Sequence, residues 1–391
     1  MVKSPIDIKR VIVEFEFTDK HLKAQDQARK FALEQIRPRM GELENGPMLP
    51  AEILRQLGNL KFLAALVPEE QGGAGLDQVG YVLTLMELSK VWGALGAVLL
   101  AHNSFYCAPL QAYANTDQKK QYLEPCAAQF KLGCLAVLEA EAGLDFTRFQ
   151  TTAVPQQNSW LLQGRKGPVL NAQAASYALT VAKSAHISGS EEINLWVVSL
   201  EPRQGLKLIR TEPEWGFSAA SPAEMIFENL TLLDDARLGR PGQGRQQLKE
   251  LEQNAWVATA ALAVGIGQAI LEEARSFTGG QTQSGKPLAA SQAIQWKLAD
   301  LATDLEAAEL LTLRAAWLMD QVKPFEKEAA MAKQYALNMV LKASRDGIQI
   351  LAGRGYLRKS PMARLIQDAE GCQLFNIYDE TLTSIIAKNL Y

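Results

Sequence analysis

The sequence predicts a mostly helical α+β protein in which two helical regions enclose a β domain. Hydrophobic spacing is helical up to about residue 130, changes to period two over about 131–243, and is helical again to the C-terminus. Helix, sheet, helix is a restrictive order for one chain of 391 residues. We therefore expect an N-terminal helical domain over 1–130, a small β-barrel or sandwich over 131–243, and a C-terminal four-helix bundle over 244–391.

The expected elements follow from local signals. Pro38 stops the first helical segment and Pro50 opens the second, while Gly and Pro separate short alternating runs in the middle region. We expect no strand after residue 250. The expected helices cover about 20–37, 50–62, 77–100, 246–276, 290–321 and 327–351.

Composition excludes several classes of protein. Apolar residues make up 48% and charged residues 21%, with a net charge of −3, so nothing indicates a nucleic-acid-binding stripe. The strongly apolar stretch 256–270 is too short to span a bilayer, and the charged N-terminus does not resemble a secretory signal. The spacing of cysteines and histidines favours buried thiols in a reducing, cytoplasmic setting and no metal site; these residues are Cys107, Cys126, Cys134, Cys372, His21, His102 and His186.

Four stretches, in order and across nearly the whole chain, resemble the acyl-CoA dehydrogenase family. They are 63–87, 136–145 (AVLEAEAGLD), 285–316 and 349–380. The resemblance implies α,β-desaturation of an acyl-CoA or acyl-carrier-protein thioester, with FAD between the last two domains as hydride acceptor. It also implies electron-transfer flavoprotein as redox partner, and a homodimer or homotetramer, or assembly with a homologous subunit.

The same resemblance places the catalytic and substrate residues. The family's I-Y-E-G-T reads I-Y-D-E-T here, so the base falls on Asp379, with Glu380 in reserve. Leu144, Trp256 and Tyr378 fall on substrate-binding positions. Some members carry the base in an E-R pair on the first C-terminal helix, but these positions hold Ala255 and Trp256.

Most expected flavin contacts are replaced. Leu stands for a hydroxyl residue at three positions, Pro168 for Trp, Gln281 for Arg and Ser284 for Phe. Each lost neutral hydrogen bond weakens binding by roughly 1 kcal/mol, so we expect weak or absent FAD in the isolated chain. The full set implied for the cofactor is Leu138, Glu139, Leu144, Pro168, Leu170, Gln281, Ser284, Gln292, Gln349, Gly353 and Thr381.

Three functions remain open at this point. The main one is an acyl-CoA dehydrogenase-like oxidoreductase that uses Asp379 or Glu380. The second is a silent or flavin-poor partner subunit of a homologous dehydrogenase, and the third is a non-redox acyl-thioester enzyme. Simple packing explains the three leucines equally well, and both carboxylates fit a solvated loop.

Overall fold

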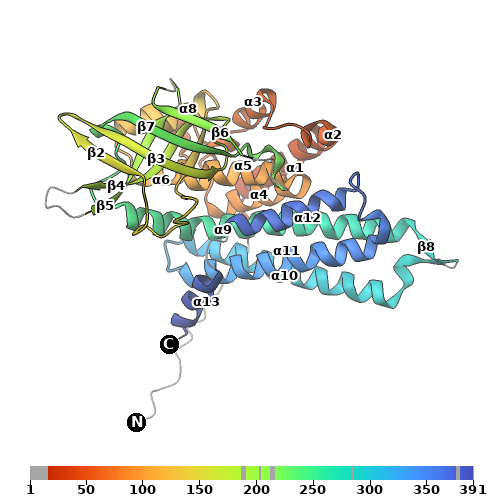
Figure 1. Cartoon of the computed structure of the whole chain (residues 1–391). Helices are drawn as coiled ribbons and strands as arrows, with labels where there is room; N and C mark the ends of the chain where they lie inside the picture. The colour runs from red at the N-terminus through yellow and green to blue at the C-terminus, as the bar shows by residue number, and fades with distance from the viewer. Residues whose placement is uncertain are drawn as a thin grey trace, which may run out of the picture.

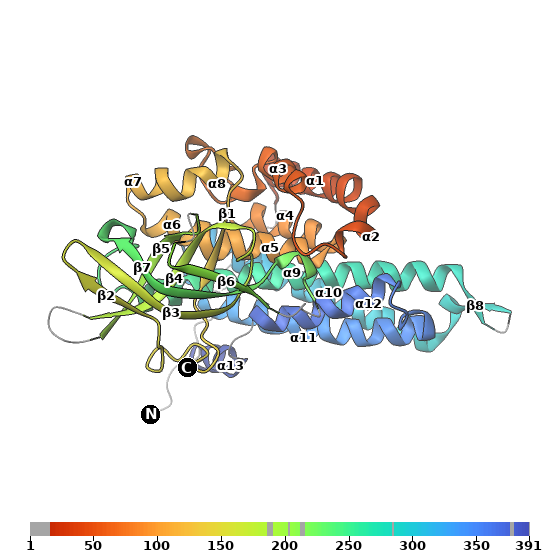
Figure 2. The same cartoon turned by 45° about the horizontal axis from the view of Figure 1, so that its top comes forward.

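The computed structural model describes residues 16–185, 191–201, 204–211, 216–283, 285–375 and 379–390. Its three parts lie as the hydrophobic periods predict: N-terminal helices on one side, a curved sheet at one end, and long C-terminal helices beneath both (Figure 1). Seen from a second direction, α9, α10 and α11 run side by side away from the sheet to a tip that carries β8 (Figure 2). The predicted fold class is confirmed.

The N-terminal domain packs around two buried helices. The expected helix over 77–100 is two helices, because the extended backbone of Trp92 (φ −151°, ψ 107°) interrupts it. Asp77 caps the first of them by accepting from Gly80 N at 2.9 Å, and Asp320 accepts from Gln78 N at 2.7 Å. The helices are α1 (Asp19–Phe31), α2 (Met40–Leu43), α3 (Ala51–Asn59), α4 (Gln78–Val91), α5 (Gly93–His102), α6 (Ala108–Tyr113), α7 (Thr116–Gln118) and α8 (Glu124–Ala128).

The middle domain is a seven-stranded mixed sheet. Strand β4 pairs with β5 antiparallel, and with β1 and then β2 in parallel; β3, β7 and β6 continue the sheet antiparallel. The two parallel pairings are not visible in the period of the sequence, because side chains alternate in either kind of pairing. The strands are β1 (Leu132–Ala136), β2 (Thr152–Gln156), β3 (Ser159–Val169), β4 (Ala175–Ala185), β5 (Glu191–Ser199), β6 (Leu206–Arg210) and β7 (Ala223–Leu233).

The C-terminal domain is built on three long helices. A two-stranded antiparallel ribbon of β8 and β9 follows the first of these helices, so the expectation that no strand follows residue 250 is wrong. Each of its strands has two residues, too few to show a period, and Gly285 (φ +78°) makes the turn. The elements are α9 (Gly244–Gly280), β8 (Thr282–Gln283), β9 (Lys286–Pro287), α10 (Gln292–Asp320), α11 (Glu326–Leu351), α12 (Pro361–Gly371) and α13 (Asp379–Lys388).

Helix α9 is the centre of the molecule. It contacts α4, α5, α10, α11, α12 and β5. Within the part of the chain that the structure describes, it is also the one helix long and apolar enough to cross a membrane by length and composition. Because 83% of its most apolar window is buried inside the protein, the same apolarity is accounted for by its place in the core.

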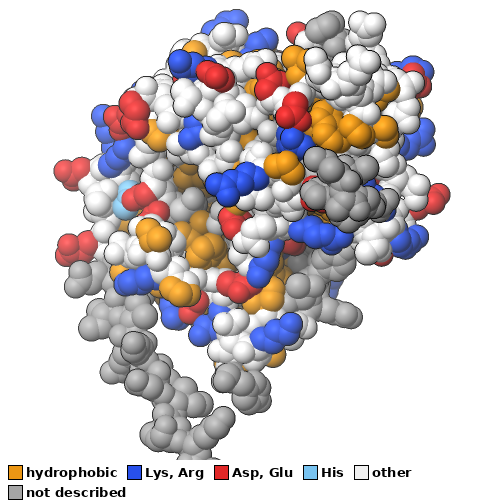
Figure 3. Space-filling model, turned by 90° about the vertical axis from the view of Figure 1, so that its left-hand side faces the viewer, with side chains coloured by type: hydrophobic (Ala, Val, Ile, Leu, Met, Phe, Trp, Pro, Cys, Tyr) orange, Lys and Arg blue, Asp and Glu red, His pale blue; other side chains and the backbone are white. Residues whose placement is uncertain are grey.

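The surface mixes charges of both signs. On the face at the sheet end, Lys and Arg side chains alternate with Asp and Glu, and hydrophobic side chains gather in small patches between them (Figure 3). This face therefore carries no continuous basic stripe of the kind that nucleic-acid backbones require.

Candidate functional site

An apolar cavity of about 160 Å³ lies where the three domains meet. Its walls come from α5 and the turn after it, from β1 and the loop that follows, from the end of β3, from α9, and from the η11 turn (Cys372–Phe375). The lining residues are Ala101, Phe105, Leu135, Val137, Leu138, Leu144, Phe146, Pro168, Leu170, Leu248, Leu251, Glu252, Ala255, Trp256, Thr259, Leu374 and Phe375.

The fold brings five of the predicted site residues into this wall. Leu138, Leu144, Pro168 and Leu170 come from the β domain and Trp256 from α9. The backbone bond from Gly167 N to Leu138 O, at 2.9 Å, joins the segment after β1 to β3. Positions far apart in the sequence thus share one cavity, although which molecule they bind stays a prediction.

Glu139 does not line the cavity but anchors the loop beside it. Its carboxylate pairs with the buried Lys166 ammonium at 2.8 Å and accepts from Gln150 N at 2.7 Å and Thr151 N at 3.0 Å. Burial by itself acts to raise the pKa of Glu139, but the Gln150 N–H and the Lys166 ammonium outweigh it and lower the pKa. Glu139 therefore stays charged and fixes the loop that carries Leu144.

The other predicted cofactor residues lie elsewhere. Gln281 follows α9, Gln292 begins α10, Gln349 is near the end of α11, and Gly353 lies in the turn after it. These four positions are exposed or half-buried. They belong to the tip of the helical domain, opposite the sheet, so this chain does not bring them to its own cavity (Figure 1).

The predicted catalytic tail is only partly described. Tyr378 of this tail lies outside the described residues, as does the predicted cofactor residue Ser284 between β8 and β9. The backbone of Asp379, Glu380 and Thr381 begins α13, but their side chains lie outside what the structure describes. Their assigned roles therefore stay predictions.

Glu252 was not predicted as a site residue, yet it lines the cavity. Among the lining residues it is the single ionisable side chain, on the same face of α9 as Leu248, Ala255 and Thr259. Burial raises its pKa, which the Lys333 ammonium and the nearby Trp256 oppose. A carboxylate within the apolar stripe of a buried helix is the sequence signal that marks this position.

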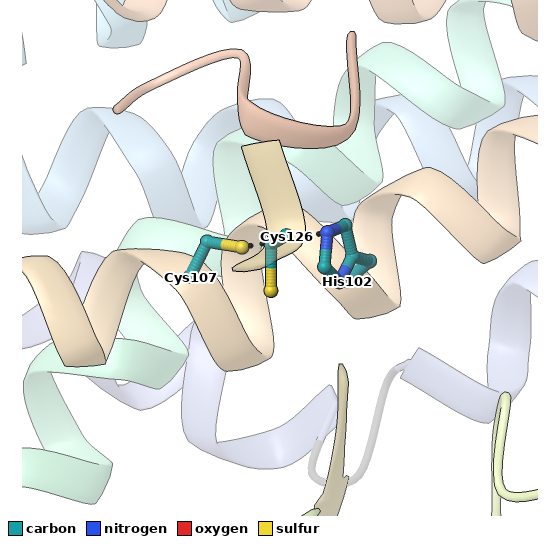
Figure 4. Close-up of side chains that lie close together, drawn as sticks. All are labelled: His102, Cys107 and Cys126. Atoms are coloured by element: carbon teal, nitrogen blue, oxygen red, sulfur yellow. Dashed lines mark hydrogen bonds between the residues drawn. The ribbon is translucent and has the colours of Figure 1, made fainter. Parts of the chain in front are cut away.

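A second buried group of titratable side chains joins the N-terminal domain to the sheet. His102, Cys107 and Cys126 lie close together, with their ligand atoms within 4.8 Å of one another (Figure 4). His102 Nε2 bonds Leu63 O at 2.7 Å, and Nδ1 accepts from Gly133 N at 2.9 Å. Burial lowers the pKa of His102 to about 4 and raises that of the Cys107 thiol. With both ring nitrogens bonded to the backbone and the thiol protonated, this group stabilises the fold and does not suit a metal.

Comparison with known proteins places the whole chain in one family. Models of the N-terminal, middle and C-terminal domains of acyl-CoA dehydrogenase match residues 18–129, 134–230 and 242–391. The chain belongs to the acyl-CoA dehydrogenase family. The predicted resemblance is thereby confirmed.

Individual members of the acyl-CoA dehydrogenase family agree over nearly the full length. The mitochondrial short-chain specific acyl-CoA dehydrogenase of Homo sapiens is 34% identical, over 96% of this chain and 91% of that protein. An acyl-CoA dehydrogenase of Bacillus subtilis is 33% identical, over 95% and 98%. The solved butyryl-CoA dehydrogenase of Megasphaera elsdenii is 27% identical and superimposes with a TM-score of 0.92, over 97% and 100%.

Acyl-CoA dehydrogenases are in general FAD-dependent oxidoreductases, but the side chains of this cavity do not fit a flavin ring. The ring needs hydrogen-bond donors at its polar edge. At Leu138, Leu144 and Leu170 the wall is hydrocarbon, and the hydroxyl of Thr259 already donates to Ala255 O at 2.8 Å. The side chains suit an apolar ligand instead.

Proposed function

We propose that this chain acts as an acyl-CoA dehydrogenase-like oxidoreductase on a short-chain acyl thioester. The observation that carries the proposal is the cavity at the junction of the three domains, in a chain whose every domain matches the family. The reaction would be α,β-desaturation; FAD, if the chain holds it, would supply the hydride acceptor, and electron-transfer flavoprotein would be the redox partner. The four buried free thiols support a cytoplasmic location.

The size and polarity of the cavity favour a short acyl group. An engineered apolar cavity of about 150 Å³ in another protein holds one benzene molecule, so a cavity of about 160 Å³ accepts a group of about six carbon atoms. Its wall is almost entirely hydrocarbon, which matches an alkyl chain. We therefore expect butyryl-CoA and hexanoyl-CoA to bind more tightly than palmitoyl-CoA in isothermal titration. Tightest binding of the long chain would contradict the assignment to a short chain.

The cofactor requires a test of its own. Because the side-chain donors are missing, we expect the isolated chain to purify colourless and to take up added FAD weakly, through backbone amides. The visible absorption spectrum before and after dialysis against FAD measures this. A yellow protein that keeps its flavin would show that the backbone alone suffices.

The base of the desaturation reaction is tested on the FAD-loaded protein. Asp379→Asn and Glu380→Gln each keep the size of the side chain and remove its negative charge. Flavin reduction by butyryl-CoA in a single turnover should fall by roughly 100-fold or more in the variant that lacks the base. If wild type reduces flavin with no acyl-CoA at all, the dehydrogenase function is wrong.

The replaced flavin contacts favour a second candidate function, that of partner subunit to a homologous dehydrogenase. The predicted cofactor residues at the tip of the helical domain are exposed or half-buried, and none of them lines the cavity where the three domains meet. Co-purification of a homologous, flavin-containing subunit from the native source would support this candidate. A colourless protein that binds acyl-CoA and has no such partner would favour a non-redox thioester enzyme.

A further inference from the structure

The wall of the apolar cavity contains one charged side chain. Among the lining residues, Glu252 on α9 is the single ionisable one. The other polar atoms of the wall's side chains are the hydroxyl of Thr259, which already donates to Ala255 O at 2.8 Å, and the indole N–H of Trp256. An ionised carboxylate in apolar surroundings is unfavourable unless polar groups meet it. Glu252 therefore marks one polar position in a space that otherwise suits alkyl groups.

Two neighbours of Glu252 favour its ionised form. The side chain of Trp256, one turn along α9, forms a hydrogen bond with the carboxylate, and Lys333 on α11 contributes a positive charge. Both oppose the rise in pKa that burial causes. A carboxylate has two oxygens with about four acceptor positions, so the bond from one indole N–H leaves capacity for a further donor.

Lys333 also decides which kind of donor suits this end of the cavity. Its ammonium donates to the backbone oxygen of Phe375, a residue that lines the cavity. A cationic group on a ligand would be attracted by Glu252 but repelled by Lys333, so its net electrostatic gain is small. A neutral O–H group avoids that repulsion and still forms a charge-assisted hydrogen bond with the carboxylate.

We propose that the cavity selects a short acyl thioester that carries a hydroxyl group, and that the Glu252 carboxylate accepts a hydrogen bond from this hydroxyl. The carbon atoms of the acyl group contact the hydrocarbon of β1, the loop after it, α5 and η11. This inference rests on the proposed function, because it names the substrate class of the same cavity. It makes Glu252 a specificity-determining residue of α9 and leaves the predicted base on α13.

The test compares the binding of butyryl-CoA, 3-hydroxybutyryl-CoA and 4-hydroxybutyryl-CoA to the full-length chain by isothermal titration. We expect the better of the two hydroxyacyl thioesters to bind at least about tenfold more tightly than butyryl-CoA, because a hydrogen bond to a charged acceptor contributes more than one between neutral groups. 3-Aminobutyryl-CoA, whose ammonium meets the charge of Lys333, should bind less tightly than 3-hydroxybutyryl-CoA.

Two substitutions of Glu252 separate its role as an acceptor from its role in packing. E252M removes the acceptor, so the preference for the hydroxyacyl thioester should fall below about twofold, while butyryl-CoA binding changes less than about threefold. E252Q keeps the size of the side chain and a neutral acceptor, so it should retain part of the preference. Glu309→Gln is the matched control, because burial also raises the pKa of Glu309 but the residue does not line the cavity.

The outcomes distinguish this inference from the proposed function. If butyryl-CoA binds wild type as tightly as both hydroxyacyl thioesters, or if 3-aminobutyryl-CoA binds most tightly, the inference is wrong and the proposed function stands. A preference that persists in E252M would also overturn it. Should E252M fail to fold, an unchanged preference in E252Q would do the same. If none of these thioesters and no hexanoyl-CoA binds wild type, the inference and the proposed function both fail.

Discussion

Individual buried charges in this protein are held by specific partners, and the nature of the partner decides what each does. Glu139 has a lysine and two backbone N–H groups, so it remains ionised. Burial among hydrocarbon raises the pKa of Glu252, although Lys333 and Trp256 oppose the rise. Asp368 accepts from Phe217 N at 3.0 Å deep in the core, and burial raises its pKa to about 6. Carboxylates of similar chemistry thus serve as a loop anchor, as a desolvated group in the cavity wall and as an internal acceptor for a backbone N–H.

The Glu139–Lys166 pair should be sensitive to loss of one partner. Lys166→Met keeps the length of the side chain but leaves a buried carboxylate without its cation, so we expect the free energy of unfolding to fall by about 3 kcal/mol. Urea denaturation measures this. The double variant Glu139→Gln with Lys166→Met should recover part of the loss, because no buried charge remains. Equal stability of the single variant and wild type would mean that the pair contributes little.

His102 should make the protein sensitive to acid. Its pKa is lowered to about 4 by burial, whereas an unfolded histidine has a pKa of about 6.5. As pH falls from about 6.5 to about 4, the unfolded chain binds a proton that the folded one does not, so stability falls by roughly 3 kcal/mol.

His102→Gln removes this proton site. Compared with the variant, wild type should lose roughly 3 kcal/mol more between these pH values. Asp368, whose raised pKa acts in the opposite direction as pH falls, is present in both proteins and cancels in the difference. Parallel stability profiles in urea titrations at pH 4 to 7 would contradict the assignment.

At the scale of the element, the features that sequence patterns do not predict lie mostly at the ends of the helices. Helix α4 begins where Asp77 and Asp320 both accept from its first N–H groups. One of these caps is local, and the other comes from the end of α10. Helix α11 ends at Ala352 with a φ of +49° and ψ of −137°, a conformation that suits glycine, and the family motif has glycine there.

Ala352→Gly should therefore stabilise the protein. We expect a gain of about 1 kcal/mol in the free energy of unfolding, because the side chain that strains the backbone is removed. Ala302→Gly, at an exposed position inside α10, is the matched control and should lower stability by about 1 kcal/mol. A loss of stability in Ala352→Gly as well, measured by thermal unfolding, would argue against strain.

For the whole molecule, the long helices leave apolar groups on the outside. Trp296 and Leu310 on α10 are 63% and 42% exposed, and Tyr335 on α11 is 37% exposed. Large exposed aromatic and aliphatic groups on neighbouring helices are typical of surfaces that another subunit covers. Members of the family form oligomers, and the predicted flavin residues at the tip of the helical domain do not line the cavity where the three domains meet.

We accordingly expect the chain to form a dimer or tetramer, alone or with a homologous subunit. Sedimentation at micromolar concentration should show the oligomer, and Trp296→Lys with Leu310→Lys should shift it toward monomer. Val154→Lys, at an exposed position on β2, is the matched control and should leave the assembly unchanged. A stable monomer of wild type alone and with its partner would refute the expectation.

Local sequence patterns predict much of this fold. The hydrophobic period depends only on neighbours a few residues apart, so it predicted α9, α10 and α11 to within a few residues, and it predicted that strands fill the middle region. Motif spacing singled out Leu138, Leu144, Leu170 and Trp256, and the fold brings all four into the wall of one cavity, although what they bind stays a prediction. The hydrophobic period did not predict the break at Trp92 or the ribbon β8–β9, because each involves too few residues to form a pattern.

The cavity and its chemistry were decided by tertiary structure. Whether Glu252 is a surface charge or a desolvated carboxylate depends on Lys333, Phe375 and Leu138, which come from segments far away in the sequence. The interaction of the Trp256 side chain with Glu252 likewise becomes visible only when every neighbour is in place. Sequence period determines which face of α9 is buried, but desolvation, pKa and hydrogen-bond satisfaction are properties of the space around a side chain, and only the folded chain defines that space.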